Sequence, residues 1–388
     1  MKTPLATLAI LGSAAAERLL LASYGVDTTP GTVATLELQH SASYGHGRKL
    51  EVIHESHECG ALPTWLDTSL GPNTVVCLDE ASKNANITTF NLEADGSLKK
   101  TSSVGTLGAA VASATYNSKS AIALAHYEPP AITTYTVHHN GLLQSLQNFT
   151  FGSPEQIHQA VVDPTGQYII FPSLGADRVH VYCIDPSTGL LTEHESLKSK
   201  TGYGPRHAVF WTSKESASTY LFLVHELSNK IVSYKVNYLE HLGGLKFTEV
   251  DEVSTYGNHT VPDKTFASEI VISPCNSFVL AANRNGTVFT VENPDPKNST
   301  RVPSDSIATF KPTAEGKLKF VQLAKSGGYY PRHFNLNKDG SMIAIANQRS
   351  YNVAIYSRDV KTGLIKDDVP VAGAAGLGPG DLMYIQWV

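Results

Sequence analysis

Charged and polar side chains recur at two fixed places in the short apolar segments of this chain. One place lies at the start of a segment, and the other lies at the end of the segment that follows it. The pairs in these places are Arg206 and Glu226, Glu269 and Arg284, and Arg332 and Gln348, and His158 begins a segment of the same kind. Arginine binds carboxylate or phosphate through a permanently charged fork of N–H donors. Histidine accepts or donates a proton near neutral pH. A site that gathered these side chains would bind a small anion and transfer protons.

The segments that carry these residues belong to a repeated unit. Each unit has a strand-like run rich in Val, Ile, Tyr and Phe, a tight turn such as Asp163–Gly166, and two further runs, and a fourth run often follows a Thr-Gly-Leu turn. The clear copies span 157–193, 205–247, 267–293 and 331–367, and weaker copies span 19–39, 63–100 and 111–144. Seven units of roughly 45–55 residues predict an all-β, seven-bladed propeller of four-stranded antiparallel blades. An open β-solenoid is the alternative, although solenoid repeats are shorter.

The two ends of the chain predict how such a ring closes. The first unit lacks an innermost strand, and the chain ends with one more strand-like run, DLMYIQWV at 381–388. We expect this run to complete the first blade and so to remove an exposed edge. The longer linkers at 193–204, 247–266 and 294–330 are expected to be surface loops.

In an antiparallel blade, the start of the innermost strand and the end of the second strand lie at the same face. The ring should therefore bring one set of polar residues to one end of its central channel: His158, Arg206, His207, Glu226, Glu269, Arg284, Arg332, His333 and Gln348. Two of the pairs, Arg206–Glu226 and Glu269–Arg284, could instead be structural ion pairs along the channel. His207 and His333 each follow an arginine, so strand alternation predicts that they point to the opposite side and serve structure.

The N-terminal residues indicate export. Residues 1–16 have one lysine, a short apolar run and a small-residue end, which is the form of a signal peptide cleaved after Ala16. The expected mature domain is therefore 17–388, secreted as a glycoprotein. Five N-x-S/T sequons support this interpretation: Asn86, Asn148, Asn258, Asn285 and Asn298. Asn285-Gly286 also fits an unmodified hairpin turn.

Composition excludes several other classes of function. The net charge is −5 and no basic cluster stands out, so a nucleic-acid partner is not expected, and no apolar run is long enough to span a membrane. The HESHE segment at 54–58 lacks the H-E-x-x-H spacing of a zinc site, so we predict no metal and no cofactor. The four cysteines allow three complete pairings, of which Cys59–Cys77 is favoured because these two are closest in sequence.

Several motifs together resemble the seven-bladed propeller lactonase family, which includes 6-phosphogluconolactonase and carboxy-cis,cis-muconate cyclase. They are G-P-R-H-x-V-F at 204–210, H-E-L-S-N at 225–229, A-S-E-I-x-I-S-P at 267–274, N-R at 283–284, P-R-x-F-N at 331–335 and N-Q-R-S at 347–350. The similarity extends over about 18–388. The resemblance implies catalytic roles for His158, Arg206, Glu226 and Arg284. The residues predicted to bind substrate are Arg332, Glu269, Gln348 and His207.

We expect an exported enzyme that opens or forms a lactone ring, with a small anionic lactone or carboxylate as its partner. The substrate favoured here is a carboxylate-bearing muconate or muconolactone, by similarity to the cyclase branch. One alternative is a sugar-lactone hydrolase similar to 6-phosphogluconolactonase. Another is a non-catalytic secreted glycoprotein or antigen on the same scaffold. A WD-type interaction scaffold fits poorly, because no Trp-Asp signature recurs.

Overall fold

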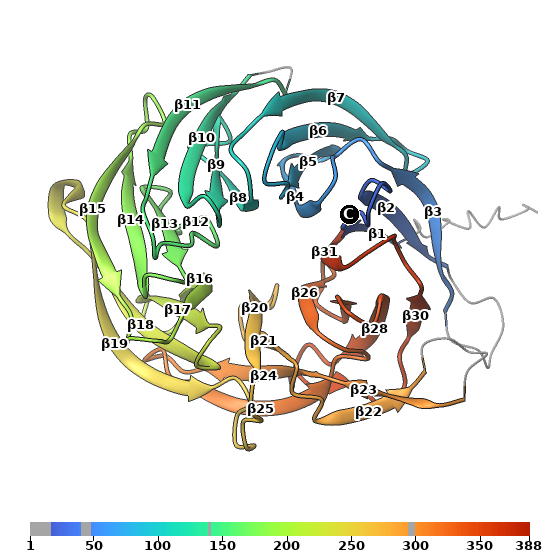
Figure 1. Ribbon diagram of the computed structural model, residues 1–388. Helices are drawn as coiled ribbons and strands as arrows, with labels where there is room; N and C mark the ends of the chain where they lie inside the picture. The colour runs from blue at the N-terminus through green and yellow to red at the C-terminus, as the bar shows by residue number, and fades with distance from the viewer. Residues whose placement is uncertain (1–16, 40–47, 139–140, 294–298) are drawn as a thin grey trace, which may run out of the picture.

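A computed structural model of the protein describes residues 17–39, 48–138, 141–293 and 299–388. In these residues the strands form seven sheets arranged as blades around a central channel, together with one separate two-stranded sheet (Figure 1). The predicted seven-bladed propeller is confirmed. The expected signal peptide, residues 1–16, and the sequon at Asn298 lie outside the described residues.

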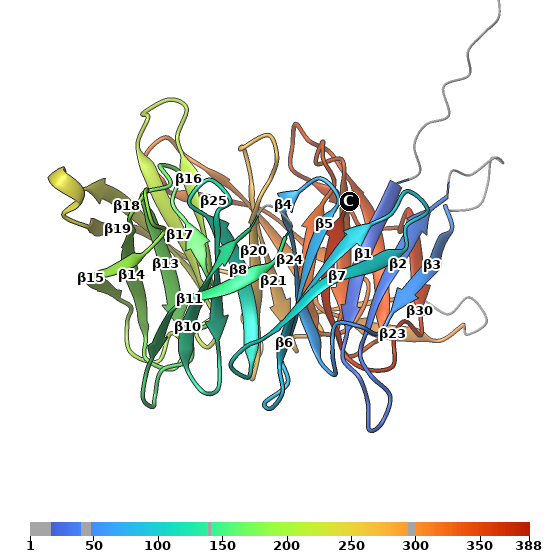
Figure 2. The ribbon, with the colours of Figure 1, turned by 90° about the horizontal axis from the view of Figure 1, so that it is seen from above.

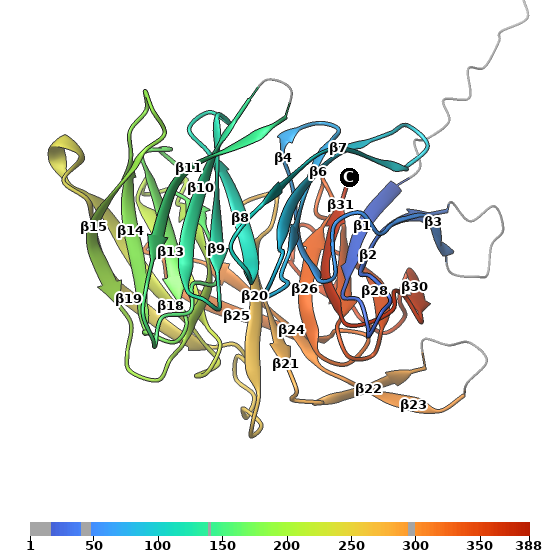
Figure 3. The same ribbon diagram turned by 45° about the horizontal axis from the view of Figure 1, so that its top comes forward.

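Both ends of the described chain contribute to the first blade, which confirms the predicted closure. Its strands are β1 (Glu17–Ser23), β2 (Thr32–Leu38), β3 (Leu50–Ser56) and β31 (Leu382–Trp387). β31 pairs with β1 and lies innermost, beside β26 (Pro331–Leu336) of the last blade (Figure 3). The final strand therefore joins the last blade to the first.

The next four blades follow one another along the chain. Blade two contains β4 (Pro63–Gly71), β5 (Thr74–Asp79), β6 (Asn86–Leu92) and β7 (Leu98–Gly105). Blade three contains β8 (Ala110–Tyr116), β9 (Ala121–His126), β10 (Ala131–Val137) and β11 (Leu143–Thr150). Blade four contains β12 (Val161–Val162), β13 (Tyr168–Ser173), β14 (Arg178–Ile184) and β15 (Leu191–Lys198). Blade five contains β16 (Pro205–Thr212), β17 (Thr219–His225), β18 (Lys230–Tyr238) and β19 (Leu245–Ser254), with the short 3-10 helix η1 (Glu240–Leu242) between its last two strands.

The last two blades carry additions. Blade six contains β20 (Phe266–Ile272), β21 (Val279–Arg284), β24 (Ser306–Pro312) and β25 (Leu318–Lys325), and the hairpin β22 (Phe289–Glu292) and β23 (Arg301–Ser304) is inserted after β21. Blade seven contains β26, β27 (Met342–Asn347), β28 (Asn352–Arg358), β29 (Ile365–Lys366) and β30 (Ala372–Ala375), the last two of which both pair with β28. Figure 2 shows the ring from its side. No helix among the described residues is long and apolar enough to cross a membrane.

The expectation that the longer linkers are surface loops was wrong for part of each, although 199–204 and 255–265 lie between strands. Residues 191–198 form β15, residues 245–254 form β19, and β24 and β25 lie within 294–330. The outermost strands β15, β19 and β25 carry many exposed and partly buried side chains, so their sequences look polar and loop-like, whereas β24 is mostly buried. The run at 289–292, expected as the third strand of blade six, is β22 of the inserted hairpin instead.

Apolar side chains pack between the blades. The second strands, such as β17, read as nearly continuous apolar runs because both of their faces are covered. Within the described residues, seven apolar clusters each join two neighbouring blades. Full burial of one large aliphatic or aromatic side chain contributes about 1.5–3 kcal/mol. The ring is therefore held together by its inter-blade surfaces, which fix the seven inner strands around the channel.

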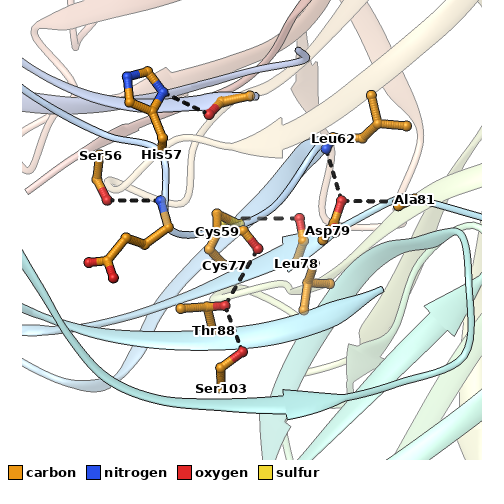
Figure 4. Close-up of a disulfide and its surroundings, with 12 residues drawn as sticks. Ser56, His57, Cys59, Leu62, Cys77, Leu78, Asp79, Ala81, Thr88 and Ser103 are labelled. Carbon is orange, nitrogen blue, oxygen red and sulfur yellow. Dashed lines mark hydrogen bonds between the residues drawn. A yellow bond between two sulfur atoms is a disulfide. The ribbon is translucent and has the colours of Figure 1, made fainter. Parts of the chain in front are cut away.

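The disulfide predicted between Cys59 and Cys77 is present and joins the β3–β4 connection to β5 (Figure 4). Asp79, at the end of β5, accepts hydrogen bonds from the backbone N–H groups of Leu62 (2.9 Å) and Ala81 (3.2 Å). These two contacts fix the backbone on either side of Glu80. The remaining cysteines, Cys183 and Cys275, are not bonded to each other.

Candidate active site

One extra residue near the start of each inner strand shapes the channel. In β16, for example, Pro205 pairs with His225 and His207 pairs with Val224, so Arg206 is a bulge residue. In β26, Arg332 occupies the same place between Pro331 and His333. The bulge residues of the seven blades are Thr64, Val111, His158, Arg206, Ser268, Arg332 and Met383. A bulge breaks the alternation of a strand and redirects its side chains.

This irregularity overturns one prediction. His207 was expected to point away from Arg206, but both side chains reach neighbouring residues of β20: Arg206 donates to the Ser268 carbonyl, and His207 Nδ1 lies 2.9 Å from Glu269 Oε1. The residues directly after the bulges are Trp65, Ala112, Gln159, His207, Glu269, His333 and Tyr384. Each inner strand therefore sends two successive side chains towards the channel.

A third set of residues comes from the ends of the second strands. In each blade, one residue near the end of the second strand pairs with a residue at the start of the inner strand, and the next residue along the chain belongs to this set. The set comprises Tyr24, Glu80, Tyr127, Leu174, Glu226, Arg284 and Gln348. The polar members of this set, together with His158, Arg206 and Arg332, meet at one end of the channel. We call eight of these residues the channel cluster: Tyr24, Glu80, Tyr127, His158, Arg206, Glu226, Arg284 and Arg332.

Glu226 binds two arginines at the centre of the channel cluster. Its Oε2 lies 2.9 Å from Arg206 Nε, and its Oε1 lies 2.9 Å from Arg284 Nη2. Only 2% of the Arg206 side chain and 4% of the Arg284 side chain are exposed, against 18% for Glu226. Burial alone would raise the pKa of Glu226, but Arg284, Arg206 and Arg332 hold it below its usual value. Glu226 is therefore ionised at neutral pH.

The predicted Glu269–Arg284 pair is not formed. Arg284 binds Glu226 of the preceding blade and donates to the Ala267 carbonyl at 3.0 Å. Glu269 lies instead beside His207, also in the preceding blade, with His333 Nε2 3.4 Å from its Oε2. Glu269 and Arg284 thus each pair with a residue of another blade and not with each other, whereas Arg206 and Glu226 pair within blade five.

Arg332 differs from the other two arginines of the channel cluster. It is partly exposed, and it makes no ion pair or hydrogen bond to any residue that the structure describes. Burial lowers its pKa, but Tyr24, Glu80 and Glu226 together raise the pKa of Arg332 above its usual value. Its guanidinium is therefore charged and has N–H donors free for a ligand.

Tyr24, Glu80 and Tyr127 were not singled out from the sequence. The Tyr24 hydroxyl donates to Glu80, and burial together with the Glu80 charge raises the pKa of Tyr24. Burial and then Glu226 raise the pKa of Tyr127, whose ring lies edge-on to His158 at 5.8 Å between centroids. These residues come from blades one to three, where the sequence repeat is weak. Tyr24, Glu80 and Tyr127 can be identified from the sequence when all seven blades are aligned on the ends of their second strands.

Tyr330 lies at the edge of the channel cluster in a strained backbone conformation, with φ at +68°. Its backbone N–H donates to Asp305 at 2.8 Å, and its ring lies between Arg284 (5.1 Å) and Arg349 (4.0 Å). A bulky residue at positive φ is costly and occurs most often at functional sites.

Gln348, one of the residues predicted to bind substrate, donates to Asp381 at 2.6 Å.

The residues that follow the bulges close the channel beneath the channel cluster. Trp65 of blade two contacts both His207 of blade five (6.0 Å between ring centroids) and His333 of blade seven (5.8 Å), so the contacts cross the channel. Tyr384 stacks on His333 at 3.9 Å. A separate pocket of about 480 Å³ lies on the other side of this layer, lined in part by Trp65 and Tyr384. The layer therefore separates this pocket from the channel cluster.

A row of buried polar groups runs from the channel cluster into this layer. His158 Nδ1 lies 3.1 Å from His207 Nε2, and His207 Nδ1 lies 2.9 Å from Glu269 Oε1. Burial lowers the pKa of His158, His207 and His333. The pKa of His333 falls to about 4, and that of His158 falls well below its usual value. Burial alone would raise the pKa of Glu269, but His207 and His333 lower it to about 2. The histidines are thus neutral and Glu269 is ionised at neutral pH.

Comparison with known proteins places this geometry in a family. The family described as "Lactonase, 7-bladed beta-propeller" matches residues 19–374. The chain belongs to this family. The predicted membership is therefore confirmed, and a small lactone is the substrate class that this family implies.

Curated relatives agree with this assignment. A protein of Arthroderma benhamiae named "Probable 6-phosphogluconolactonase" is 27% identical over 317 residues, which is 78% of this chain and 75% of the relative. The 6-phosphogluconolactonase of Formosa agariphila is 27% identical over 274 residues, covering 66% of this chain and 69% of that protein. Among solved structures, the periplasmic gluconolactonase of Pseudomonas aeruginosa has the same fold, with a TM-score of 0.78 at 20% identity over 96% of this chain and 99% of that one.

Proposed function

We propose that this lactonase-family protein hydrolyses sugar lactones in its channel cluster. The observation that carries the proposal is the charged guanidinium of Arg332, which has no partner among the described residues, beside a neutral histidine, His158. Arg206 and Arg284 are already bound to Glu226, so Arg332 is the arginine with donors free for substrate. The relatives named 6-phosphogluconolactonase support a sugar lactone over the muconolactone favoured by the sequence motifs.

The reaction needs one base and one oxyanion site. His158 Nε2 removes a proton from water, and the resulting hydroxide adds to the lactone carbonyl carbon. Arg332 donates to the carbonyl oxygen as it becomes negatively charged. The ring C–O bond then breaks, and the His158 imidazolium returns its proton to the departing ring oxygen. The product is the open hydroxycarboxylic acid, so one water is consumed and no redox step occurs.

The other charges of the channel cluster set its preference for substrate. Three guanidiniums face the two carboxylates Glu80 and Glu226, which leaves an excess of positive charge. Glu226 holds Arg206 and Arg284 in place, and the charges of Arg206 and Arg332 lower the pKa of His158 further after the effect of burial. We therefore expect an anionic lactone to bind more tightly than a neutral lactone of the same ring size.

A panel of lactones tests the proposal. The purified full chain would be assayed by acid release in a pH-stat with glucono-1,5-lactone, 6-phosphoglucono-1,5-lactone and a carboxymuconolactone. We expect turnover of the sugar lactones above the spontaneous rate, and a loss of about 100-fold or more in kcat/KM for Arg332→Gln and His158→Ala. Arg301→Gln, in the exposed β23, is the matched control and should retain full activity. Turnover of the carboxymuconolactone alone would restore the sequence-based prediction. No turnover of any lactone would favour the non-catalytic glycoprotein.

We also propose that the protein is exported and glycosylated. The proposal rests on the leader-like residues 1–16 and on sequons such as Asn148 and Asn258, which are exposed on the surface. Peptide mapping of protein secreted by a fungal host would test it. An intact N-terminus retained inside the cell would contradict it.

A further inference from the structure

We infer that Glu269 and His207 are positioning residues that hold His158 as a base with its free Nε2 lone pair towards the channel cluster. This inference deepens the proposed function, because it gives the proposed base its protonation state. It also assigns Glu269 and His207 a role other than the substrate contact predicted from the sequence.

Glu269 defines the first step. Its Oε1 accepts the backbone N–H of Ile270 at 3.0 Å and lies 2.9 Å from His207 Nδ1. An ionised carboxylate only accepts hydrogen bonds, so the proton of neutral His207 must lie on Nδ1. Both Glu269 and His207 have side chains less than 5% exposed, so water does not compete for this contact.

His207 defines the second step. With its proton on Nδ1, its Nε2 carries a lone pair and can only accept. The atom that lies 3.1 Å from this Nε2 is His158 Nδ1, which must therefore carry the proton and donate. Neutral His158 then has its lone pair on Nε2, on the opposite side of the ring. His158 Nε2 makes no hydrogen bond to any described residue, so it is available to substrate water.

His333 supports the assignment from the other side of Glu269. The backbone N–H of Ile385 donates to His333 Nδ1 at 3.4 Å, so His333 carries its proton on Nε2. That nitrogen lies 3.4 Å from Glu269 Oε2. Glu269 therefore has a ring nitrogen of a histidine beside each of its oxygens, and its Oε2 makes no hydrogen bond to any described residue. His333 touches the same carboxylate as His207 but is not between Glu269 and His158.

The arrangement also explains how a base can work in this environment. Arg206 and Arg332 both face His158 and oppose a positive charge on it, while Tyr127 lies at its ring edge. When His158 takes a proton from water, its Nδ1–H remains bonded to His207. The negative charge of Glu269 then stabilises the new imidazolium through His207. This is the role of the carboxylate in a Ser-His-Asp triad, extended by one imidazole.

Nitrogen-15 NMR of histidine in the full chain tests the inference without substrate. We expect wild-type His158 and His207 as Nδ1–H tautomers and His333 as the Nε2–H tautomer. In Glu269→Gln, the side-chain amide can present its NH2 group to His207 Nδ1, and His207 would then carry its proton on Nε2, facing His158. A mixture of tautomers is therefore expected at His158. In the matched variant His333→Asn, the His158 tautomer should not change. An Nε2–H tautomer of His158 in the wild type would overturn the inference, even if Glu269→Gln failed to fold.

Kinetics give the second readout. Glu269→Gln should lower kcat by about 100-fold with little change in KM, and should move the acid limb of the pH profile to lower pH, because His158 becomes a weaker base. A loss of rate with an unmoved acid limb would indicate a structural role only and would overturn the inference. If no lactone is turned over by the wild type, the proposed function fails while the tautomers still decide the inference.

Discussion

Replacing Glu226 by glutamine should destabilise the whole ring. Glu226 holds Arg206 and Arg284 with one carboxylate oxygen each, both at 2.9 Å, and the two arginine side chains are 2% and 4% exposed. A glutamine oxygen can accept from one guanidinium, but its NH2 group then faces the donors of the other. The variant therefore leaves two buried cations without a counter-charge, and removal of one partner of such a group costs about 3–5 kcal/mol.

Urea denaturation of wild type and Glu226→Gln at pH 7 would measure this cost. The matched control is Glu249→Gln, the same change in a surface pair with Lys200 where both side chains are more than 40% exposed. Exposed pairs contribute at most about 1 kcal/mol, so the control should unfold close to the wild type. If Glu226→Gln lost no more free energy of unfolding than Glu249→Gln, the argument from buried charge would be refuted.

The pH dependence of the difference has a definite sign. The pKa of Glu226 is lower in the folded protein than in the unfolded chain, where a glutamate titrates at about 4.3. The stabilisation is therefore fully present above about pH 4.3 and is lost as the pH falls through the lower folded pKa. The difference between wild type and Glu226→Gln should be constant between pH 6 and 8 and should shrink below about pH 4.

Three further outcomes are expected. Arg332→Met should change the free energy of unfolding by less than about 1 kcal/mol, since no described residue pairs with this guanidinium, yet it should weaken binding of an anionic lactone at least tenfold by calorimetry. Cys59→Ser should cost about 3 kcal/mol by urea denaturation, because the disulfide closes a loop with a sequence separation of 18, whereas Cys183→Ser should cost less. Peptide mapping should find Asn285 without a glycan, because its amide donates to the Lys264 carbonyl at 2.7 Å and accepts from Tyr329, whereas exposed Asn148 should be modified.

The ring itself could be predicted from the sequence because its signal is repeated. Each blade needs a buried second strand and a tight turn before it, and both leave clear patterns. In the turn at 163–166, for example, Asp163 accepts the Thr165 N–H at 2.9 Å and Gly166 takes φ +71°. The pairing of Arg206 with Glu226 was also predictable, since the two lie side by side at the open end of one hairpin. Closure by β31 followed from the missing strand of the first blade.

The contacts between blades could not be predicted in the same way. Glu269 and Arg284 belong to one hairpin, yet each pairs with a residue of the preceding blade. Which neighbour a channel side chain reaches depends on the tilt of adjacent blades and on the bulge at the strand start. Neither leaves a mark in the pattern of apolar residues. The outer strands were missed for a related reason, since a strand with one exposed face resembles a polar loop.

The bulges account for both halves of the site. In a regular strand only one of two successive residues would face the channel, so Arg206 and His207 could not both serve it. The extra residue in each inner strand allows the bulge position to supply groups for substrate, as with His158 and Arg332. The following position supplies the layer beneath, as with His207 and Glu269. The proposed base His158 is therefore held from below by His207, which follows the bulge of the next blade. A deletion of one residue at the start of β16 would remove this arrangement while leaving the rest of the blade paired.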